Sequence, residues 1–595
     1  MTMNVKNMIW CVALFAGMLA ACKKDKSDNV NNNNLNLIKS SNTNIRLFNF
    51  TDYDVDMTIN NIPLTAYGKK DGNNILLPGT GNVTQLGLQY FPKEAWKAAE
   101  GGSPFTLPTT LLDKNGRADI NLLVGGLNID TVLQNNTLQP MDYYLFRRLI
   151  NNVDSFYFVT LQRESNPPAI AERFKIRILN FGGQEDPLGM YGPVTLTYAD
   201  GRPVSDKLSN IAPNTASPYI ELPYGAYQFK LFMSDGSSID ITKQFTQAPV
   251  QPDYQSTLPL PQPQEGVVVP VRSYKPGAAY TLLLNPAGMK YNSKYTGNDV
   301  TTDAYNMNVY RLVTDIAPGV NYAFARVQAA NAIPGATLNV TVDGTPVSQG
   351  LAFGKSDAYK VLTRGDHMVA ISDAGGKELA RKTLTLYPYD NYTIWAVQKA
   401  DGSADIAFAA INMTSSQFEP NANLTGYDGS AGVKTVPYAC SVRFLNLSPD
   451  LPLLTFTNDY SLMMTLDYFK NMPFAAACNL ASGVVPDVEP FLNYSIGKRT
   501  LGLSNPANVG FGELTKLRAY ESSTGKYPDL PGKLRADIEP LSVREAFIAN
   551  KAIYTDPSYM PWGEVGVYTV ALIGKVTPGA GAGEKARIMV IKHNQ

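Results

Sequence analysis

Cys22 is the residue with the clearest chemistry in this sequence. The letters LAAC at residues 19–22 have the small side chains that a lipoprotein signal peptidase accepts, and the Cys22 thiol can then take up a diacylglyceryl group. The apolar segment at 8–20 is shorter than the roughly 20 residues that span a bilayer. Residues 1–21 therefore predict a lipoprotein signal peptide, with cleavage before Cys22.

Lipidation at Cys22 predicts a membrane as the first partner. A mature lipoprotein carries two or three acyl chains, and each buried methylene adds about 0.8 kcal/mol of membrane affinity. The polar letters KKDKSD at 23–28 begin a tract that continues, rich in Asn, to residue 43. Such a composition favours a flexible tether. An ordinary secretory signal with a chance cysteine is the alternative, and this tract disfavours it.

Histidine is scarce, which limits the catalytic chemistry to be expected. The sequence has only His367 and His593, so a Ser-His-Asp site or a zinc site is disfavoured. We expect His367 to pack within a strand and His593 to be solvated. Paired carboxylates, as glycosidases use, have no signature that the sequence alone reveals. The prediction is a protein that is not an enzyme and binds no cofactor or metal.

Cys440 and Cys478 allow two interpretations. An oxidising envelope permits a disulfide between them, which would contribute roughly 4 kcal/mol in the chain-entropy model. The alternative is two buried free thiols, since cysteine is often a small core residue. The sequence leaves both interpretations open.

Four aromatic residues are candidates for ligand contact. Trp96 lies in one insertion with helical character, and Tyr554, Tyr559 and Trp562 lie at the end of another at 537–562. Aromatic rings beside polar groups can stack on sugar rings. The simpler interpretation is that each ring covers the end of a folded module.

The composition predicts an all-β chain without a nucleic-acid partner. Lys and Arg number 51, as do Asp and Glu, so the net charge is zero and no basic surface for nucleic acid is expected. Only 17% of residues are charged, while Tyr (33), Phe (24), Gly (47) and Pro (40) are abundant. Many aromatics and turn formers favour short strands joined by tight turns.

A set of short motifs recurs along the chain. An opening strand reads RLFNF at 46–50, RILNF at 177–181 and RFLNL at 443–447, with a weaker copy RVQAA at 326–330. An aromatic residue stands six positions before a glycine at Tyr219, Tyr359 and Phe491, and we expect positive φ at Gly225, Gly365 and Gly497. A closing hairpin begins with Tyr-Thr at 280, 392 and 568.

These motifs predict tandem Ig-like antiparallel β-sandwich modules behind a lipidated N-terminal tether. Short strands of this kind bury one face and expose the other. The predicted organisation is a signal peptide at 1–21, a tether at 22–43, module 1 at 44–165, module 2 at 173–313, module 3 at 321–413, a linker at 414–436, and module 4 at 437–595 with an insertion.

The motifs resemble the family catalogued as domain of unknown function 4397. Module 3 matches best, through RVQA at 326–329, VDGTPV at 342–347, LAFG at 351–354, the pair Tyr359 and Gly365, and the dipeptide at 392–393. The resemblance implies a β-sandwich that is secreted or lipid-anchored. It implies no shared reaction or ligand.

The lipobox with its Asn-rich tether also resembles lipoproteins of the Bacteroidetes group, many of which lie in the outer membrane. Surface-export tracts there are usually acidic, whereas Lys23, Lys24 and Lys26 make this one mixed, so periplasmic and surface facing both stay open. The letters DTV at 130–132 resemble the O-glycosylation motif of that group, with Thr131 as the acceptor.

Three functions follow as hypotheses. The first is an outer-membrane lipoprotein of the cell envelope that binds an extracellular ligand, either a glycan or an envelope protein. The second is a structural spacer or assembly subunit of an envelope complex. The third, a glycan-active enzyme, would require two carboxylates that face each other across a cleft.

Overall fold

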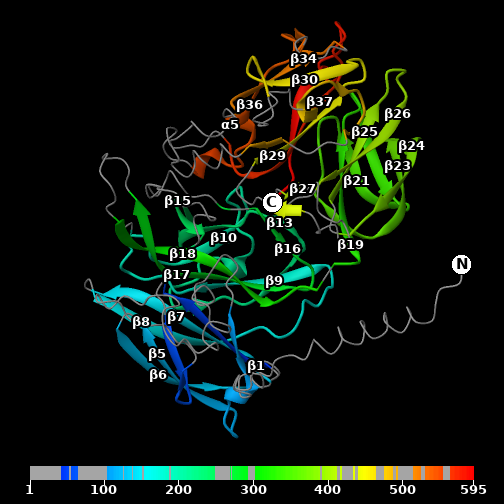
Figure 1. Cartoon of the computed structure of the whole chain (residues 1–595). Helices are drawn as coiled ribbons and strands as arrows, with labels where there is room; N and C mark the ends of the chain where they lie inside the picture. Colours follow the sequence, from blue (N-terminus) through cyan, green and yellow to red (C-terminus); the bar gives the residue numbers. More distant parts are fainter. Residues whose placement is uncertain are drawn as a thin grey trace, which may run out of the picture. The chain divides into compact units, whose positions relative to one another are not determined.

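The computed structural model describes most of the chain beyond the predicted tether. The described residues are 42–51, 55–63, 104–124, 126–136, 138–150, 153–186, 189–236, 238–247, 269, 271–292, 302–319, 321–388, 391–411, 416–418, 433–435, 440–463, 475–486, 491–493, 514–523, 530–553 and 563–595. Their regular secondary structure is nearly all strand, and most pairings are antiparallel, which confirms the predicted all-β class (Figure 1). A single turn of α-helix, α5 (Val543–Ala546), follows β36.

Contacts divide the chain into two units. The first comprises residues 1–47, 55–93 and 105–141, and the second comprises 48–54, 94–104 and 142–595. The predicted module 1 is therefore shared between the units, because β7 and β8 belong almost wholly to the second. The module boundaries themselves stay predictions.

The first unit contains a sheet with strand order β3-β2-β5-β6. Its buried face carries Val55, Ile59, Ile120 and Leu122, all at most 2% exposed. Beside this sheet, β1 pairs with β4 in antiparallel fashion. The strands are β1 (Asn42–Phe50), β2 (Val55–Ile59), β3 (Ile62–Pro63), β4 (Phe105–Pro108), β5 (Arg117–Val124) and β6 (Leu127–Gln134).

In the second unit, the opening strand of modules 2, 3 and 4 pairs in parallel with a strand near the module's end. The pairs are β9 with β17, β19 with β25, and β29 with β37. The chain passes from the opening strand into a second sheet and re-enters the first sheet from the same end, which makes this pairing parallel. The predicted antiparallel β-sandwich modules thus each contain one parallel pair that the sequence analysis did not foresee.

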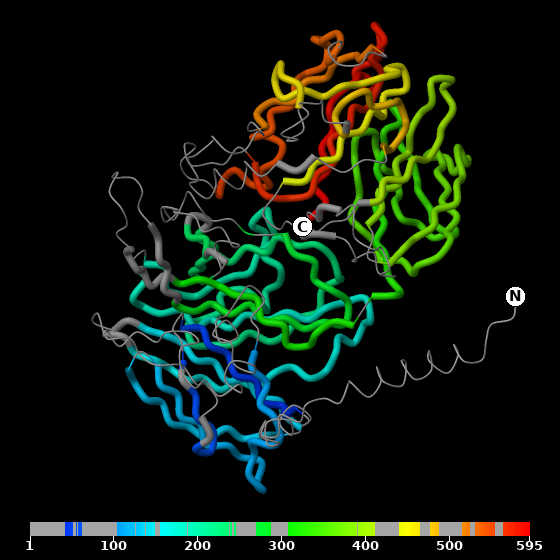
Figure 2. The backbone as a smooth tube through the Cα atoms, in the orientation of Figure 1, coloured from blue at the N-terminus to red at the C-terminus, as the bar shows by residue number. Residues whose placement is uncertain are grey.

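Modules 3 and 4 have the same topology. Module 3 has sheets β22-β19-β25-β26 and β21-β20-β23-β24, and module 4 has β33-β29-β37-β38 and the path β31-β30-β34-β35. The backbone of module 3 can be followed in green in Figure 2. The strands of module 3 are β19 (Phe324–Asn331), β20 (Thr337–Val342), β21 (Thr345–Ala352), β22 (Lys360–Thr363), β23 (Gly365–Asp373), β24 (Glu378–Leu386), β25 (Asn391–Gln398) and β26 (Ala404–Ile411).

Along the chain, module 4 is preceded by a small two-stranded sheet, β27 with β28, which lies in the predicted linker. In addition to its main path, β32 pairs with β30, and β36 pairs with β34. The strands are β27 (Ser416–Phe418), β28 (Val433–Thr435), β29 (Cys440–Leu447), β30 (Leu453–Asn458), β31 (Ser461–Leu462), β32 (Leu480–Ala481), β33 (Phe491–Asn493), β34 (Lys516–Glu521), β35 (Lys533–Leu534), β36 (Leu541–Ser542), β37 (Gly566–Ile573) and β38 (Arg587–Lys592).

Module 2 follows the same plan with its two sheets joined, in the order β10-β14-β15-β18-β17-β9-β11. The joint is a short parallel contact between β15 and β18. The strands of the second unit up to this point are β7 (Met141–Ile150), β8 (Val153–Gln162), β9 (Arg173–Asn180), β10 (Val194–Thr197), β11 (Thr215–Ala216), β12 (Ile220–Pro223), β13 (Gly225–Tyr227), β14 (Lys230–Asp235), β15 (Ser238–Gln247), β16 (Arg272–Tyr274), β17 (Ala279–Asn292) and β18 (Thr302–Ile316).

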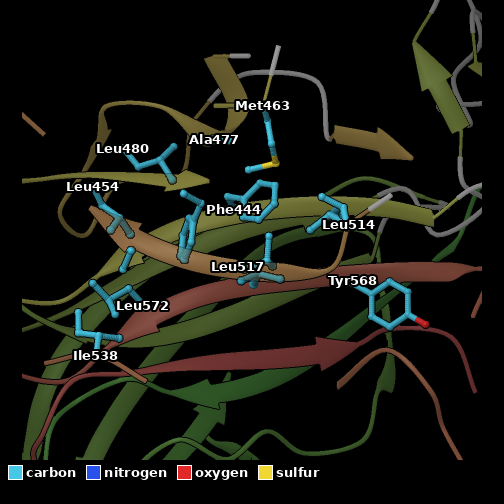
Figure 3. Close-up of a cluster of buried hydrophobic side chains, with 14 of the residues drawn as sticks. Phe444, Leu454, Met463, Ala477, Leu480, Leu514, Leu517, Ile538, Tyr568 and Leu572 are labelled. Carbon is cyan, nitrogen blue, oxygen red and sulfur yellow. The ribbon is translucent and has the colours of Figure 1, made fainter. Parts of the chain in front are cut away.

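The parallel strands are buried on both faces, which corrects the expectation that one face is exposed. Every residue of β37 is buried, and so is all of β25 except its last. One face of β37 contributes Tyr568, Val570 and Leu572 to the core of module 4 (Figure 3). The other face contributes Ala571 and Ile573 to a second cluster.

That second cluster joins module 3 to module 4. Ala330 and Trp395 of module 3 and Leu445 and Ala571 of module 4 belong to it, and none of them is exposed to solvent. A comparable aromatic cluster joins the end of β1 and β7 to module 2. It contains Phe48, Phe50, Tyr144, Phe146, Leu179, Leu283 and Val313.

A buried asparagine is the last or the second-last residue of the opening strand of every module. Asn49, Asn180, Asn331 and Asn446 are at most 3% exposed. In module 3 the Asn331 amide nitrogen donates to the carbonyls of Ala336 and Leu351, both at 2.9 Å. Its amide oxygen accepts the backbone N–H of Ile333 at 2.9 Å. This side chain therefore fixes the crossing from one sheet to the other.

The asparagine also corrects the alignment of module 3. Arg177 and Arg443 pair with Thr281 and Thr569 in their parallel ladders, whereas Thr393 pairs with Gln328. The true copy of the opening motif is thus residues 328–331, two positions after the predicted one. The fold therefore requires the asparagine of the motif. It does not require the arginine, because module 3 has Gln328 at that position.

One of the predicted turn glycines has a different role. Gly365 has φ +127°, as predicted. Gly225 is not among the described residues with positive φ, and a Cβ there would overlap the Arg326 guanidinium. Gly225 is therefore a point of close approach between modules 2 and 3. Gly497 lies outside the described residues.

We expect Asn331→Ala to destabilise module 3 strongly. Two carbonyls and one N–H would be left buried without their partner, and each such loss costs about 1–3 kcal/mol. Hydrogen–deuterium exchange should show faster exchange in β19 and β25, with a loss of about 3 kcal/mol or more in the free energy of unfolding. Gln349→Ala, which truncates an exposed amide of the same module, is the control. Equal protection in both variants would contradict the assigned role.

Candidate functional site

Several residues singled out by the sequence lie outside the described part of the chain. These are Cys22, Trp96, Tyr554, Tyr559 and Trp562. Their predicted lipidation and ligand contacts stay predictions.

Cys440 and Cys478 are free thiols in the structure, so the disulfide interpretation is not the one it shows. Cys440 is fully buried in the core of module 4 beside Val442 and Phe444. Burial raises the pKa of the Cys440 thiol well above its usual value and that of Cys478 to about 11. Neither is therefore a thiolate near neutral pH, the form that would react.

Thr131 lies in the first unit, on β6, opposite Ile120 of β5. Its side chain is half-buried. The preceding Asp130 accepts a hydrogen bond from the Asn121 amide at 2.7 Å. The predicted glycosylation motif thus forms part of a strand.

His367 is buried, as predicted, but polar contacts hold it. Its Nδ1 lies 2.7 Å from an Asp343 carboxylate oxygen and its Nε2 lies 2.8 Å from the Thr363 carbonyl oxygen. Both partners are acceptors, so the ring acts as a structural link within module 3.

His593 was predicted to be solvated, and this was wrong, because only 2% of it is exposed. Its Nδ1 accepts hydrogen bonds from the Gln328 amide at 3.1 Å and from the Tyr359 hydroxyl at 2.7 Å. Its Nε2 lies 2.7 Å from the Thr569 hydroxyl. These contacts require a neutral ring with its proton on Nε2. Burial, together with nearby Arg443 and Arg326, lowers the pKa of His593 to about 3.

Arg326 links modules 2 and 3 next to this histidine. Its guanidinium carbon lies 4.7 Å from the centre of the Tyr359 ring and 5.7 Å from that of Tyr224. Nε donates to the Asn391 amide oxygen at 2.7 Å. The repeated arginine and tyrosine motifs of the sequence therefore meet here in a structural cluster between modules.

A cavity of about 500 Å³ lies between module 2 and module 4, and it is our candidate binding site. Small-ligand sites commonly have volumes of about 300–1,000 Å³. Module 2 contributes the turn after β10, and module 4 contributes Ala549 and the residues around the end of β38. The lining residues are Tyr198, Ala199, Asp200, Arg202, Ala549, Lys592, Asn594 and Gln595.

A turn positions the residues that module 2 contributes. The N–H of Gly201 donates to the carbonyl of Tyr198 at 3.0 Å, and Gly201 has φ +86°. This tight turn places Asp200 beside Arg202, whose Nε donates to the carboxylate at 2.6 Å. Across the cavity, the Asn550 amide donates to the Asp200 carbonyl at 2.9 Å and ties the turn to module 4.

The residues after β38 form the opposite wall. Gln595 pairs with β13 like an added strand, because Gln228 N–H donates to its carbonyl at 2.7 Å and its own N–H donates to the Ala226 carbonyl at 3.2 Å. The Asn594 amide oxygen accepts the Val567 N–H at 2.9 Å. The wall is therefore held by backbone hydrogen bonds to both modules.

Three charges lie at the base of this wall. Glu564 contacts Lys230 at 3.0 Å and Lys592 at 3.1 Å. Burial raises the pKa of Glu564, but the two ammonium groups outweigh that effect and hold it at about 2. The carboxylate is therefore ionised at neutral pH and bridges module 2 to module 4.

The groups that line the cavity are suited to binding a ligand. Among the described lining residues, Asp200 carries the one side-chain carboxylate, and Arg202 already bonds it. No group of three or more His, Cys, Asp and Glu is placed to hold a metal ion in the part of the chain that the structure describes. What remains is the half-buried Tyr198 ring, which has the Arg202 guanidinium carbon 5.8 Å from its centre and Tyr227 stacked against it at 6.3 Å, together with hydrogen-bonding groups around it.

Sequence reasoning missed this cavity. It assigned no site to residues 198–202 and gave residues 592–595 no role beyond a solvated histidine. The sequence motifs report on local structure, whereas the two walls of the cavity come from segments that are far apart in sequence.

Removing the central carboxylate should show how strongly the charge triad holds modules 2 and 4 together. Glu564→Gln leaves the buried Lys230 beside Lys592 without the carboxylate that binds both, and breaking such a buried pair costs about 3–5 kcal/mol. Urea unfolding should reveal a loss of that size. Glu378→Gln breaks an exposed pair with Arg381 and should leave the free energy of unfolding nearly unchanged, because solvent screens such a pair. Similar losses in the two variants would contradict a stabilising triad.

The buried neutral His593 predicts a loss of stability in acid. Its pKa is about 3 when folded and 6.5 ordinarily, so protons favour the unfolded chain. The contribution is complete above about pH 6.5, falls as the pH drops below that value, and levels off below the folded pKa, with about 1.4 kcal/mol for each pKa unit. His593→Gln should lose less stability between pH 7 and 4.5 in urea unfolding. An unchanged pH dependence would overturn this assignment.

Comparisons with known proteins support the resemblance for one part of the chain. A comparison with curated proteins found none that matches. The model of the family described as Domain of unknown function (DUF4397) matches residues 325–438. The match begins within β19 and extends beyond β28, so it includes almost all of both sheets of module 3. Residues 325–438 of this all-β chain thus form a DUF4397 domain.

Proposed function

We propose that this chain is a non-catalytic binding protein of the cell envelope, which holds a glycan in the cavity between modules 2 and 4. The observation that carries the proposal is the cavity itself, with an aromatic ring and several polar groups on walls from two modules. Sites of this size and lining suit a small polar ligand or the end of a larger one.

The lining has the groups that sugar recognition needs. The Tyr198 ring is half-buried, with the Arg202 guanidinium carbon 5.8 Å from its centre. The uncovered part of the ring can contact the C–H face of a sugar, since aromatic side chains combine apolar area with a polar tip. Arg202, Lys592 and Gln595 surround it with groups that can bond hydroxyls. Hydrolysis is not proposed, because two carboxylates are required and the described lining supplies only Asp200.

We further propose that lipid on Cys22 holds the protein at the outer membrane and that the tract at 22–43 lets the folded modules stand away from it. The support for this is the LAAC sequence and the tether composition. Within the described residues, no helix combines the length and apolar character needed to cross a membrane.

A spacer or assembly subunit is the second candidate. The apolar clusters between neighbouring modules support it, because Trp395 and Ala571 lie fully buried in the one that joins modules 3 and 4. Modules fixed in this way would suit a part that holds other envelope proteins at a set distance.

A binding screen of the full chain against neutral and acidic glycans tests the first proposal. We expect saturable binding that Tyr198→Ala weakens about tenfold or more, which corresponds to about 1.4 kcal/mol. Tyr460→Ala is the matched control, since Tyr460 is an exposed tyrosine with Arg518 stacked on it at 4.2 Å. Trp96→Ala and Trp562→Ala test the other candidate rings. Absence of binding by folded protein would favour the spacer.

A further inference from the structure

The unused hydrogen-bonding groups of the cavity are mainly donors. The Arg202 side chain is 77% exposed, and its two terminal nitrogens make no hydrogen bond with the described residues. Lys592 uses two of its three protons, on Glu564 at 3.1 Å and Gln228 at 3.2 Å. The Tyr198 hydroxyl also has no partner among the described residues, and burial raises its pKa, so it remains a donor.

The acceptors near the cavity are already engaged. One Asp200 oxygen accepts the Arg202 N–H at 3.1 Å and the other accepts its Nε at 2.6 Å. Glu564 accepts from Lys230, Lys592 and the Ala549 N–H. The Gln228 amide oxygen accepts from Lys592 and from Asn594.

This imbalance defines the ligand that fits. A group placed here must supply acceptors, and it approaches two cationic side chains whose own carboxylate partners already accept hydrogen bonds on both oxygens. Hydrogen bonds from Arg and Lys to an anionic oxygen are about twice as strong as neutral ones. The free edge of a guanidinium also matches the two oxygens of a carboxylate in a planar fork.

We propose that the cavity recognises an acidic glycan through the carboxylate of a uronate sugar. Arg202 and Lys592 bind the carboxylate, and the sugar ring contacts the part of Tyr198 that the Arg202 guanidinium, 5.8 Å from the ring centre, leaves uncovered. This inference rests on the proposed function, because it names the ligand class of the same cavity.

Calorimetry on the full chain separates charge recognition from sugar recognition. The probes are a panel of uronate oligosaccharides and the same oligosaccharides as methyl esters, which keep the hydroxyls and lose the charge. We expect the acids to bind at least tenfold more tightly than the esters. Arg202→Gln should remove most of that preference, and Arg381→Gln, an exposed arginine of module 3 that pairs with Glu378, should retain it.

Each other outcome overturns a defined part of the proposal. Equal binding of acids and esters that still depends on Tyr198 would overturn the carboxylate and leave the glycan site standing. Equal binding of sulfated oligosaccharides of the same length would overturn the choice of carboxylate over other anions. No saturable binding of any of these probes by folded protein would overturn the inference, and the screen of neutral and acidic glycans then decides whether the proposed function falls with it.

Discussion

A strand that is buried on both faces must find apolar partners in two cores at once. The parallel pairs formed by the opening strand and the late strand meet this demand in modules 2 to 4. In module 4, Val570 faces the module's own core while Ala571 faces module 3. The buried asparagine then fixes where the chain leaves the pair for the second sheet. The joining of modules and the position of the cavity walls depend on this central pair.

The sequence predicts the fold well because the fold is specified by local patterns. Alternating strands, Asp-Gly turns and the Tyr-Thr dipeptides indicate the all-β class and the recurring order of elements. The two-sided burial and the parallel pairing could have been predicted from the sequence. The segment VYTVALI at 567–573 is nearly all apolar and does not alternate. Gly225 could not be interpreted locally, because its lack of a side chain serves Arg326 of another module.

The candidate site was far less predictable, because its chemistry arises only where modules meet. Equal numbers of acidic and basic residues give a net charge of zero, yet the fold places Lys230 and Lys592 on a single Glu564. The net charge of a chain does not show where the fold brings charged side chains together. His593 illustrates the same point, since a residue near the end of the sequence is normally solvated, and here it is enclosed by side chains from modules 3 and 4.

The strand-like contact of Gln595 with β13 also determines the order in which the protein can fold. Asn594 bonds Gln228 across 366 residues of sequence, and Gln595 completes the ladder beside it. A ribosome delivers the earlier modules first, so this edge of module 2 stays unpaired until residues 592–595 have been made. Contacts of such sequence separation form slowly, and an open strand edge invites wrong pairing meanwhile. The chain therefore depends on late docking to protect a module that is made early.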